Sequence, residues 1–426
     1  MFDHQRQRAT HDYRGWQIRI LAATWLAYAG YYFCRKPFYI LKASMADSLG
    51  WSPLVLGQLG MAYNLAYAAG QFSSAFFGRR LGPKLLLLAG MATSIACNLV
   101  FGVANSFWTL LLFLTLNGIA QGTGWPGCIG SLAYWFKRRQ RGSVLGVWST
   151  CYQLGSVLAG SYAAYLLGLA GWRWSFFGAS MILLLVWFAV LFLHPNRPED
   201  VGLEPLRDED DEAPGKGSVR AEGLGWTGPV VATILLMGLI YFCLKFLRYA
   251  LWSWSPYFLN KNFGLTGSEA GYLSVVFDVT GFLGVLAAGF LSDRLFQGRR
   301  ALLSLILLVL MTASFVVMYS YGATSVLAFA VSLGLVGFTL YGPDSLLSGA
   351  GAIDVGSPRG ALTAAGIING LGSLGQVCQE PLIPWLYESS GRDLAPILLL
   401  LVGVAVAGSA ATFLLWRLAK SGFAKI

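Results

Sequence analysis

The chain has 426 residues, of which 56% are hydrophobic and only 12% are charged, and its mean hydropathy is +0.60. Too few polar residues remain to cover a water-soluble globule, so the composition predicts an integral protein that crosses a membrane several times. The formal net charge of +10 lies in short loops between apolar runs rather than on one basic face, which argues against a nucleic-acid partner.

In chain order, a polar leader over residues 1–16 precedes a first apolar run that is too long for a secretory signal peptide and has no cleavage site, so we expect the leader to remain as the start of the first helix. Twelve apolar segments follow, each close to the roughly twenty residues that span hydrocarbon as a helix. The predicted spans are 17–40, 53–77, 84–103, 106–132, 143–168, 172–193, 229–259, 268–291, 301–321, 324–348, 360–386 and 394–416.

One long polar stretch, His194 to Gly225, divides these segments six and six. The sequence therefore predicts an N-terminal six-helix bundle over 1–193, a cytoplasmic linker over 194–228 and a C-terminal six-helix bundle over 229–426. If both termini lie in the cytoplasm, most lysines and arginines fall in cytoplasmic loops, and the opposite side holds Lys42, Arg173, Lys261 and Arg392. This bias follows the positive-inside rule and fixes the predicted orientation.

Among the arginines inside predicted spans, Arg35 in the first and Arg248 in the seventh lie several residues from either end. An arginine at bilayer depth costs roughly 2.5–3.5 kcal/mol on insertion scales, so it usually faces a bundle interior or a water-filled cavity. Each guanidinium can donate two hydrogen bonds to a phosphate or carboxylate, which predicts an anion site. The alternative is that these side chains reach the membrane interface and bind nothing.

The two halves of the chain also resemble each other. Corresponding landmarks are separated by 213 to 218 residues: Arg35 and Arg248, Arg79 and Arg294, Arg141-Gly142 and Arg359-Gly360. Parallel six-helix repeats place a substrate site near the midplane at their interface. The sequence thus predicts one central anion site to which each half contributes an arginine. Two like charges there predict obligatory exchange, because a carrier without an anion would reorient slowly.

Several short motifs carry a family resemblance. The loop GFLSDRLFQGRR (289–300) resembles the loop motif of the major facilitator superfamily, whereas the matching loop SAFFGRRLGPK has Gly78 in place of the acidic residue. Five more stretches, YYFCRKPF, GTGWPGC, NRPEDVGL, LRYALWSWSP and GFTLYGPDSL, together resemble the organophosphate:phosphate antiporters. That family includes transporters of glycerol 3-phosphate and hexose 6-phosphate and the microsomal glucose-6-phosphate translocase.

The resemblance implies an all-α fold of twelve transmembrane helices in two pseudo-repeats, with both termini cytoplasmic. It places the two phosphate-binding arginines on Arg35 and Arg248, and implies gating loops at Arg79, Arg80, Asp293 and Arg294. Similarity to the glycerol 3-phosphate branch would predict a lysine at Gln71 and a histidine at Tyr152. Because both positions are neutral here, we favour a sugar phosphate as the substrate.

Other side chains are candidates for contact with the organic group, by hydrogen bonding or stacking: Tyr32, Gln71, Trp125, Trp148, Tyr152, Tyr249 and Asn369. For the aromatic residues the alternative is packing in the core or in an interfacial belt. Asp278 and Glu380 lie within apolar runs and are candidates for coupling or specificity, or for a structural polar contact. Asp344 is expected to be an interfacial carboxylate.

Enzymatic and ATP-driven functions find no support in the sequence. The three histidines lie in polar stretches without a second clustered ligand, which predicts neither a metal site nor a catalytic triad, and no phosphate-binding glycine loop is present. No cofactor is expected. The leading hypothesis is a monomeric carrier in a bacterial cytoplasmic (inner) membrane that exchanges organic phosphate for inorganic phosphate. A membrane sensor of the same ligand and a proton-coupled anion symporter are the alternatives.

Overall fold

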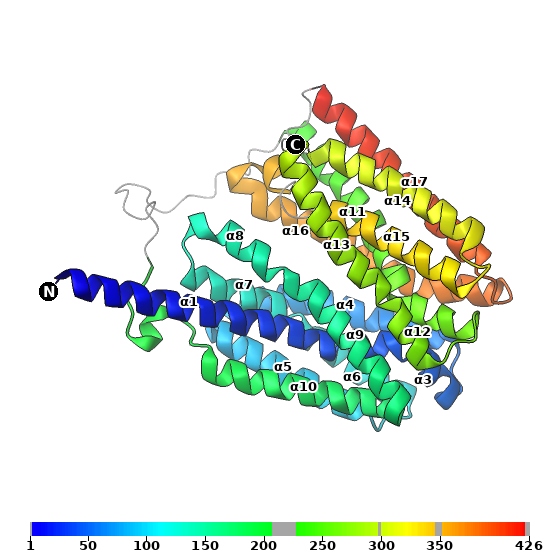
Figure 1. Ribbon diagram of the computed structural model, residues 1–426, viewed down its shortest axis with the longest axis horizontal. Coiled ribbons are helices and arrows are strands. Elements are labelled where there is room, and N and C mark those ends of the chain that lie inside the picture. Colours follow the sequence, from blue (N-terminus) through cyan, green and yellow to red (C-terminus); the bar gives the residue numbers. More distant parts are fainter. Residues whose placement is uncertain (1, 207–226, 297–299, 346–351, 422–426) are drawn as a thin grey trace. The chain divides into compact units, whose positions relative to one another are not determined.

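The computed structural model describes residues 2–206, 227–296, 300–345 and 352–421, without the side chains of 2–12, 75–79, 138, 139, 142, 293, 300, 301 and 352–365. Every regular element in these residues is a helix (Figure 1). In chain order they are α1 (Phe2–Phe33), α2 (Lys36–Ile40), α3 (Lys42–Leu49), α4 (Pro53–Leu81), α5 (Pro83–Phe101), α6 (Phe107–Gln121), α7 (Gly124–Trp135), α8 (Arg138–Trp148), α9 (Thr150–Ala170), α10 (Trp172–Leu193), η1 (Pro198–Val201), α11 (Gly228–Lys261), α12 (Gly267–Ser274), α13 (Val276–Arg294), α14 (Arg300–Tyr321), α15 (Val326–Ser345), α16 (Ala352–Ser389) and α17 (Ala395–Lys420).

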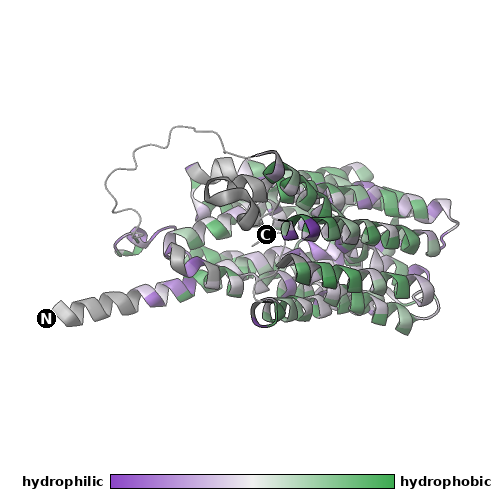
Figure 2. Ribbon diagram, turned by 90° about the horizontal axis from the view of Figure 1, so that it is seen from above, coloured by the Kyte–Doolittle hydropathy of each residue, from purple (hydrophilic) through white to green (hydrophobic). Residues whose placement is uncertain are grey.

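Hydrophobic residues dominate the long helices, as Figure 2 shows. Within the described residues, seven helical stretches are long and apolar enough to cross a membrane: 83–101, 172–193, 228–261, 267–292, 302–321, 326–345 and 395–420. Each predicted span falls on one helix or on two consecutive helices. The predicted spans 17–40, 106–132, 143–168 and 268–291 are each divided by a short break that an apolar pattern does not reveal.

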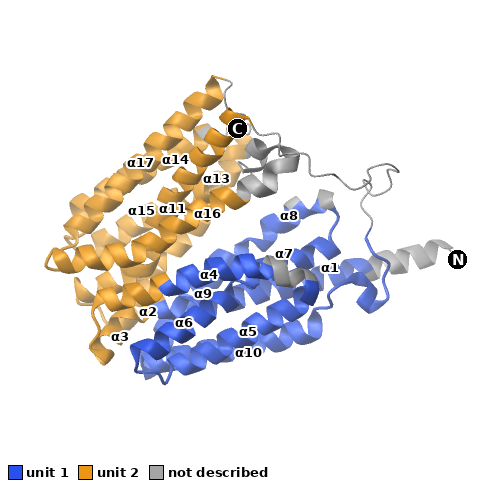
Figure 3. Cartoon of the chain, turned by 180° about the vertical axis from the view of Figure 1, so that it is seen from behind, with its two compact units in different colours: residues 1–38, 62–219 blue, residues 39–61, 220–426 orange. Residues whose placement is uncertain are grey.

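The chain forms two compact units (Figure 3). Unit 1 consists of residues 1–38 and 62–219, and unit 2 of residues 39–61 and 220–426. Unit 2 therefore includes α3 and the first residues of α4, although these precede most of unit 1 in the sequence. Residues 207–226, which include most of the predicted linker and its acidic run, lie outside the described residues.

Within each unit the helices approach closely at glycines. In unit 1, a Cβ on Gly70 of α4 would overlap the backbone of Ile119 in α6. In unit 2, a Cβ on Gly375 of α16 would overlap the carbonyl of Phe242 in α11. Such contacts are expected for helices in lipid, where association depends on close van der Waals packing rather than on hydrophobic burial.

The beginning of the linker folds against unit 1. Asn196 accepts a hydrogen bond from the backbone N–H of Lys84 at 2.8 Å, in the first turn of α5. His194, which directly follows α10, is fully buried, and its Nε2 lies 2.8 Å from the hydroxyl of Ser131. Burial and, to a smaller extent, the positive charge of Lys84 together lower the pKa of His194 to about 4.

Candidate substrate site

The site in unit 1 is built on a break in the first predicted span. Helix α1 ends at Phe33 and α2 begins at Lys36, because Pro37 has no N–H group to continue the helix and its ring would clash with the carbonyl of Phe33, four residues earlier. The break leaves the carbonyl of Cys34 without a helical partner. The amides of Asn98 and Asn117 donate to that oxygen at 3.2 and 3.0 Å. Arg35 thus lies on a short non-helical turn that two other helices hold in place.

Arg35 is buried, with 8% of its surface exposed. Its Nε and Nη2 both donate to the amide oxygen of Gln121, at 3.2 and 3.0 Å. The amide nitrogen of Gln121 in turn donates to the carbonyl of Tyr31 at 3.1 Å, which fixes the orientation of the amide. No carboxylate pairs with Arg35 among the residues that the structure describes. The hydrogen-bond partner of the guanidinium is therefore a neutral amide, and no carboxylate among the described residues compensates its positive charge.

Two tyrosine rings cover the guanidinium of Arg35. Its Cζ lies 4.9 Å from the ring centroid of Tyr32 and 4.7 Å from that of Tyr67, within the range of cation–π attraction. The Tyr67 hydroxyl accepts a hydrogen bond from Gln71 at 3.0 Å, so Gln71 is linked to Arg35 through one ring. Tyr32 and Gln71 were predicted from the sequence. Tyr67 and Gln121 were not, although Gln121 directly precedes the GTGWPGC motif.

A second group of rings extends from Tyr32. Tyr28 lies 6.0 Å from Tyr32 and 5.0 Å from Tyr152, measured between ring centroids, and Trp125 stacks on Tyr152 at 5.6 Å. Trp148 touches the same rings but is fully buried. Trp125 is 40% exposed and Tyr152 is partly exposed. The predicted aromatic residues of unit 1 thus form one cluster. In it the rings of Trp125 and Tyr152 are accessible to solvent, and the buried ring of Trp148 packs against both.

The arginine of unit 2 has a different partner. Arg248 on α11 donates from Nη1 to the carboxylate of Asp344 on α15 at 2.7 Å, and its Cζ lies 4.3 Å from the ring of Tyr341. Tyr341 donates its hydroxyl to Asp278 on α13 at 2.8 Å. Asp344, which the sequence suggested was an ordinary interfacial residue, is therefore the carboxylate paired with Arg248.

The remaining unit 2 candidates have distinct surroundings. Tyr249 lies beside Arg248, with its ring centroid 5.7 Å from the guanidinium carbon. Asn369 on α16 is partly exposed and accepts a hydrogen bond from Ser373 through its backbone oxygen. Glu380 forms an ion pair with Lys42 at 2.8 Å, and both side chains are fully buried. Glu380 is thus engaged by a lysine that the sequence placed in a loop.

The predicted gating loops are described in part. Arg294 stacks on Phe290, with its Cζ 5.1 Å from the ring centroid, and Arg80 is exposed. The side chains of Arg79 and Asp293 lie outside the described residues. No cluster of three or more histidine, cysteine, aspartate or glutamate side chains that could hold a metal ion occurs in the part of the chain that the structure describes.

Comparison with known proteins agrees with the fold. The family model described as "Major Facilitator Superfamily" matches residues 21–377. Among solved structures, a bacterial homolog of the human lysosomal transporter Spinster superposes with a TM-score of 0.74 at 17% identity, over 94% of this chain and 97% of that one. The D-xylose-proton symporter has a TM-score of 0.72 at 12% identity, over 94% of this chain and 97% of its own. At these identities the likeness concerns the fold alone.

Curated relatives narrow the family. A putative glycerol-3-phosphate transporter of Arabidopsis thaliana is 28% identical over 93% of this chain and 87% of its own length. The glycerol-3-phosphate transporter of Bacillus subtilis (strain 168) is 26% identical, over 85% and 84%. Sugar phosphate exchanger 3 of Xenopus laevis is 29% identical, over 79% and 74%. The chain therefore belongs to the major facilitator superfamily, and its resemblance to the organophosphate:phosphate antiporters is confirmed.

Proposed function

We propose that this protein exchanges an organic phosphate for inorganic phosphate across a membrane by alternating access, and that the organic phosphate is a sugar phosphate such as hexose 6-phosphate. The proposal includes twelve transmembrane helices, cytoplasmic termini, a monomer and a bacterial inner membrane. The observation that carries it is Arg35, a buried guanidinium that a neutral amide holds in position. Relatives named as glycerol-3-phosphate transporters and sugar phosphate exchangers support the same class of substrate.

Gln121 occupies the Nε side of Arg35 and leaves the N–H groups of Nη1 for another acceptor. We assign these donors to phosphate, because charge-assisted hydrogen bonds to a phosphate oxygen are short and strong when water is excluded. The organic group would lie near Gln71, Trp125 and Tyr152. A sugar suits these residues, since its hydroxyls can hydrogen-bond to the amide and its C–H face can lie against an aromatic ring.

The pairing of Arg248 with Asp344 changes the electrostatic argument for obligatory exchange. Without an anion, Asp344 already neutralises Arg248, so the repulsion between two uncompensated arginines that the sequence suggested is much reduced. Phosphate must then compete with Asp344 for Arg248, whereas no such competitor faces Arg35 among the described residues. The free-energy barrier to reorientation of the unloaded carrier then comes mainly from the buried charge of Arg35.

A counterflow assay tests the function. Proteoliposomes loaded with phosphate receive labelled hexose 6-phosphate, glycerol 3-phosphate or phosphate outside, and protein-free liposomes serve as the blank. We expect uptake of a labelled sugar phosphate that depends on internal phosphate. Uptake that follows an imposed proton gradient and ignores internal phosphate would indicate a symporter. Tight binding of the sugar phosphate without any uptake would indicate a sensor. Either result would overturn the proposal.

A further inference from the structure

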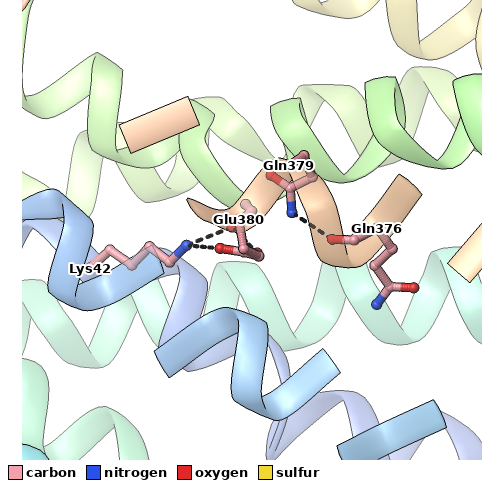
Figure 4. Close-up of polar contacts among 5 residues, drawn as sticks. Lys42, Gln376, Gln379 and Glu380 are labelled. Carbon is pink, nitrogen blue, oxygen red and sulfur yellow. Dashed lines mark hydrogen bonds and ion pairs between the residues drawn. The ribbon is translucent and has the colours of Figure 1, made fainter. Parts of the chain in front are cut away.

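Two lysines of unit 2 differ in what faces their ammonium groups. Lys42 on α3 is fully buried and lies 2.8 Å from the carboxylate of Glu380 on α16, and the two side chains point toward each other (Figure 4). Lys245 on α11 is partly exposed, and its Nζ donates to the hydroxyl of Ser373 on α16 at 3.3 Å. Among the side chains that the structure describes, no carboxylate lies within ion-pair distance of Lys245. Lys42 thus has its own carboxylate, whereas the hydrogen-bond partner of Lys245 is neutral.

The side chain of Lys245 points toward α16. Its ammonium lies 4.9 Å from the ring centroid of Tyr241, which is buried one turn earlier on α11. A Cβ on Gly372 of α16 would overlap that ring, so the two helices meet closely at this level. The hydroxyl of Ser373 donates to the backbone oxygen of Asn369 at 2.9 Å, and its own oxygen accepts from the ammonium. Lys245 is therefore held at the contact between α11 and α16.

Lys245 and Arg248 lie on the same side of α11, because residues three apart on a helix are neighbours, with roughly 5–6 Å between their Cβ atoms. Asp344 on α15 pairs with Arg248 at 2.7 Å and also lies close enough to act electrostatically on the ammonium of Lys245. Asp278 on α13 accepts a hydrogen bond from the hydroxyl of Tyr341 at 2.8 Å. On this side of α11, two positive groups therefore share the carboxylate of Asp344.

We propose that Lys245 and Ser373 form a second anion subsite beside Arg248, which binds a carboxylate carried by the transported organic phosphate. The ammonium donates to a carboxylate oxygen, and the carboxylate supplies the negative charge that the shared Asp344 does not. Since the two cations are neighbours on one helix, a short carbon chain can bring its phosphate to Arg248 and its carboxylate to Lys245. The inference rests on the proposed function. It narrows the sugar phosphate to one with an acidic end, a phosphorylated sugar acid, which binds more tightly than its neutral counterpart.

The test compares the binding of matched ligands and does not depend on transport. 6-Phosphogluconate and sorbitol 6-phosphate share their carbon chain and phosphate, and differ only in a carboxylate against a hydroxymethyl group at the other end. 3-Phosphoglycerate and the glycerol 3-phosphate of the same configuration form the equivalent shorter pair. Isothermal titration calorimetry of the purified full chain in detergent gives the Kd of each ligand. We expect the acid to bind about tenfold or more tightly than the alcohol in at least one pair, because only the acid forms a charge-assisted hydrogen bond to Lys245.

Lys245→Met removes the ammonium and keeps most of the volume of the side chain. In the pair that shows the preference, we expect this variant to bind acid and alcohol within about threefold of each other, and to change the Kd of the alcohol by less than about threefold. Lys245→Gln, which is polar but uncharged, is the second variant if Lys245→Met does not fold. Lys261→Met is the matched control, since Lys261 lies at the end of the same helix, is paired with Asp47, and should keep the wild-type ratio.

The outcomes distinguish this subsite from the proposed function. Equal binding of acid and alcohol in both pairs, a preference that survives in Lys245→Met, or no binding of any of these ligands would overturn the subsite. Equal binding together with phosphate-dependent uptake of a neutral sugar phosphate in the counterflow assay would overturn the subsite and leave the exchange function standing. A preference that Lys245→Met abolishes, in a protein that performs no exchange, would support the subsite and overturn the exchange function.

Discussion

Arg35 and Arg248 differ in what holds them, and a lysine could not replace either. Two guanidinium nitrogens of Arg35 donate to the amide oxygen of Gln121. Arg248 donates to the carboxylate of Asp344, and its guanidinium lies against the ring of Tyr341. A lysine keeps the positive charge but has neither the planar fork nor the ring stacking. The chemistry of each site thus depends on the shape of the cation as well as on its charge.

We predict that Arg35→Lys and Arg248→Lys each reduce phosphate exchange by about a hundredfold or more, because bidentate recognition is lost while the charge remains. The measurement is initial exchange rate in proteoliposomes at matched protein content. Arg173→Lys is the matched control, since Arg173 donates to Gly102 and Asn105 in a loop of unit 1 and lies against the ring of Trp172. Wild-type phosphate affinity in either site variant would contradict the assignment.

His194 predicts a pH dependence of stability. Its pKa is about 4 in the folded protein and near 6.5 in an unfolded chain, so the unfolded state binds the proton more readily between these values. Its contribution to stability is therefore present above pH 6.5 and is lost as the pH falls toward 4, by at most about 3 kcal/mol.

The measurement is the apparent unfolding temperature in detergent between pH 7.5 and 5. We expect His194→Gln to flatten the decline that the wild type shows below pH 6.5, because glutamine does not titrate in this range. Equal slopes for the two proteins would show that protonation of His194 does not destabilise the fold.

At the scale of the element, two side-chain amides stabilise the break between α1 and α2 by donating hydrogen bonds to the same carbonyl. Asn98 and Asn117 come from α5 and α6, and both donate to Cys34. We predict that either alanine substitution costs about 1 kcal/mol, since the other amide still satisfies the oxygen. The double variant should cost more than the sum of the two, because it leaves a buried carbonyl unpaired. The free energies come from unfolding in denaturing detergent, and strictly additive values would contradict this account.

Hydrophobic patterning located the predicted spans but not their internal breaks. The turn at Cys34 and Arg35 is announced by Pro37, whereas the turn at Gly122 and Thr123 lies in a continuous apolar run and has only small residues to mark it. The length and hydropathy of a segment cannot distinguish a bent helix from a straight one, because both have the same apolar residues. Pro37 indicates a break but not its bounds, so only the structure places Arg35 on the non-helical turn.

For the whole molecule, we expect the balance between exchange and unidirectional efflux of phosphate to depend on Asp344. We predict that Asp344→Asn increases phosphate affinity by about tenfold and slows efflux into phosphate-free buffer, because it removes the carboxylate that pairs with Arg248 at 2.7 Å. The measurement compares efflux of labelled phosphate with and without external phosphate, in the variant and in the wild type.

Asp278→Asn is the comparison variant, because Asp278 accepts a hydrogen bond from the hydroxyl of Tyr341 at 2.8 Å. If wild-type efflux proceeds at the same rate in both buffers, the carrier does not require exchange. If Asp344→Asn weakens phosphate binding, the carboxylate is not a competitor of the anion.

The sequence motifs predicted the family correctly. The assignment of the two arginines to phosphate stays a prediction, which is possible because a charge within an apolar run and its repeat in the second half are visible in the residue order. It did not reveal the partners of those charges. In the sequence, nothing marks the residues that take part in these pairs, namely Gln121, Asp344 and Lys42. Their partners become visible only when the packing of the helices is known. Pairing is a property of helix packing, and no spacing along one helix encodes it.

The ion pair between Lys42 and Glu380 also has a consequence for the synthesis of the chain. Its members are 338 residues apart. At about 5–20 residues per second, Lys42 emerges from the ribosome roughly 20 to 70 s before its carboxylate exists. During that interval burial of the charged lysine in the membrane is energetically unfavourable, so residues 39–61 should remain at the membrane surface until α16 has been inserted. The final assembly of unit 2 then has to wait for nearly the last helix of the protein to be made.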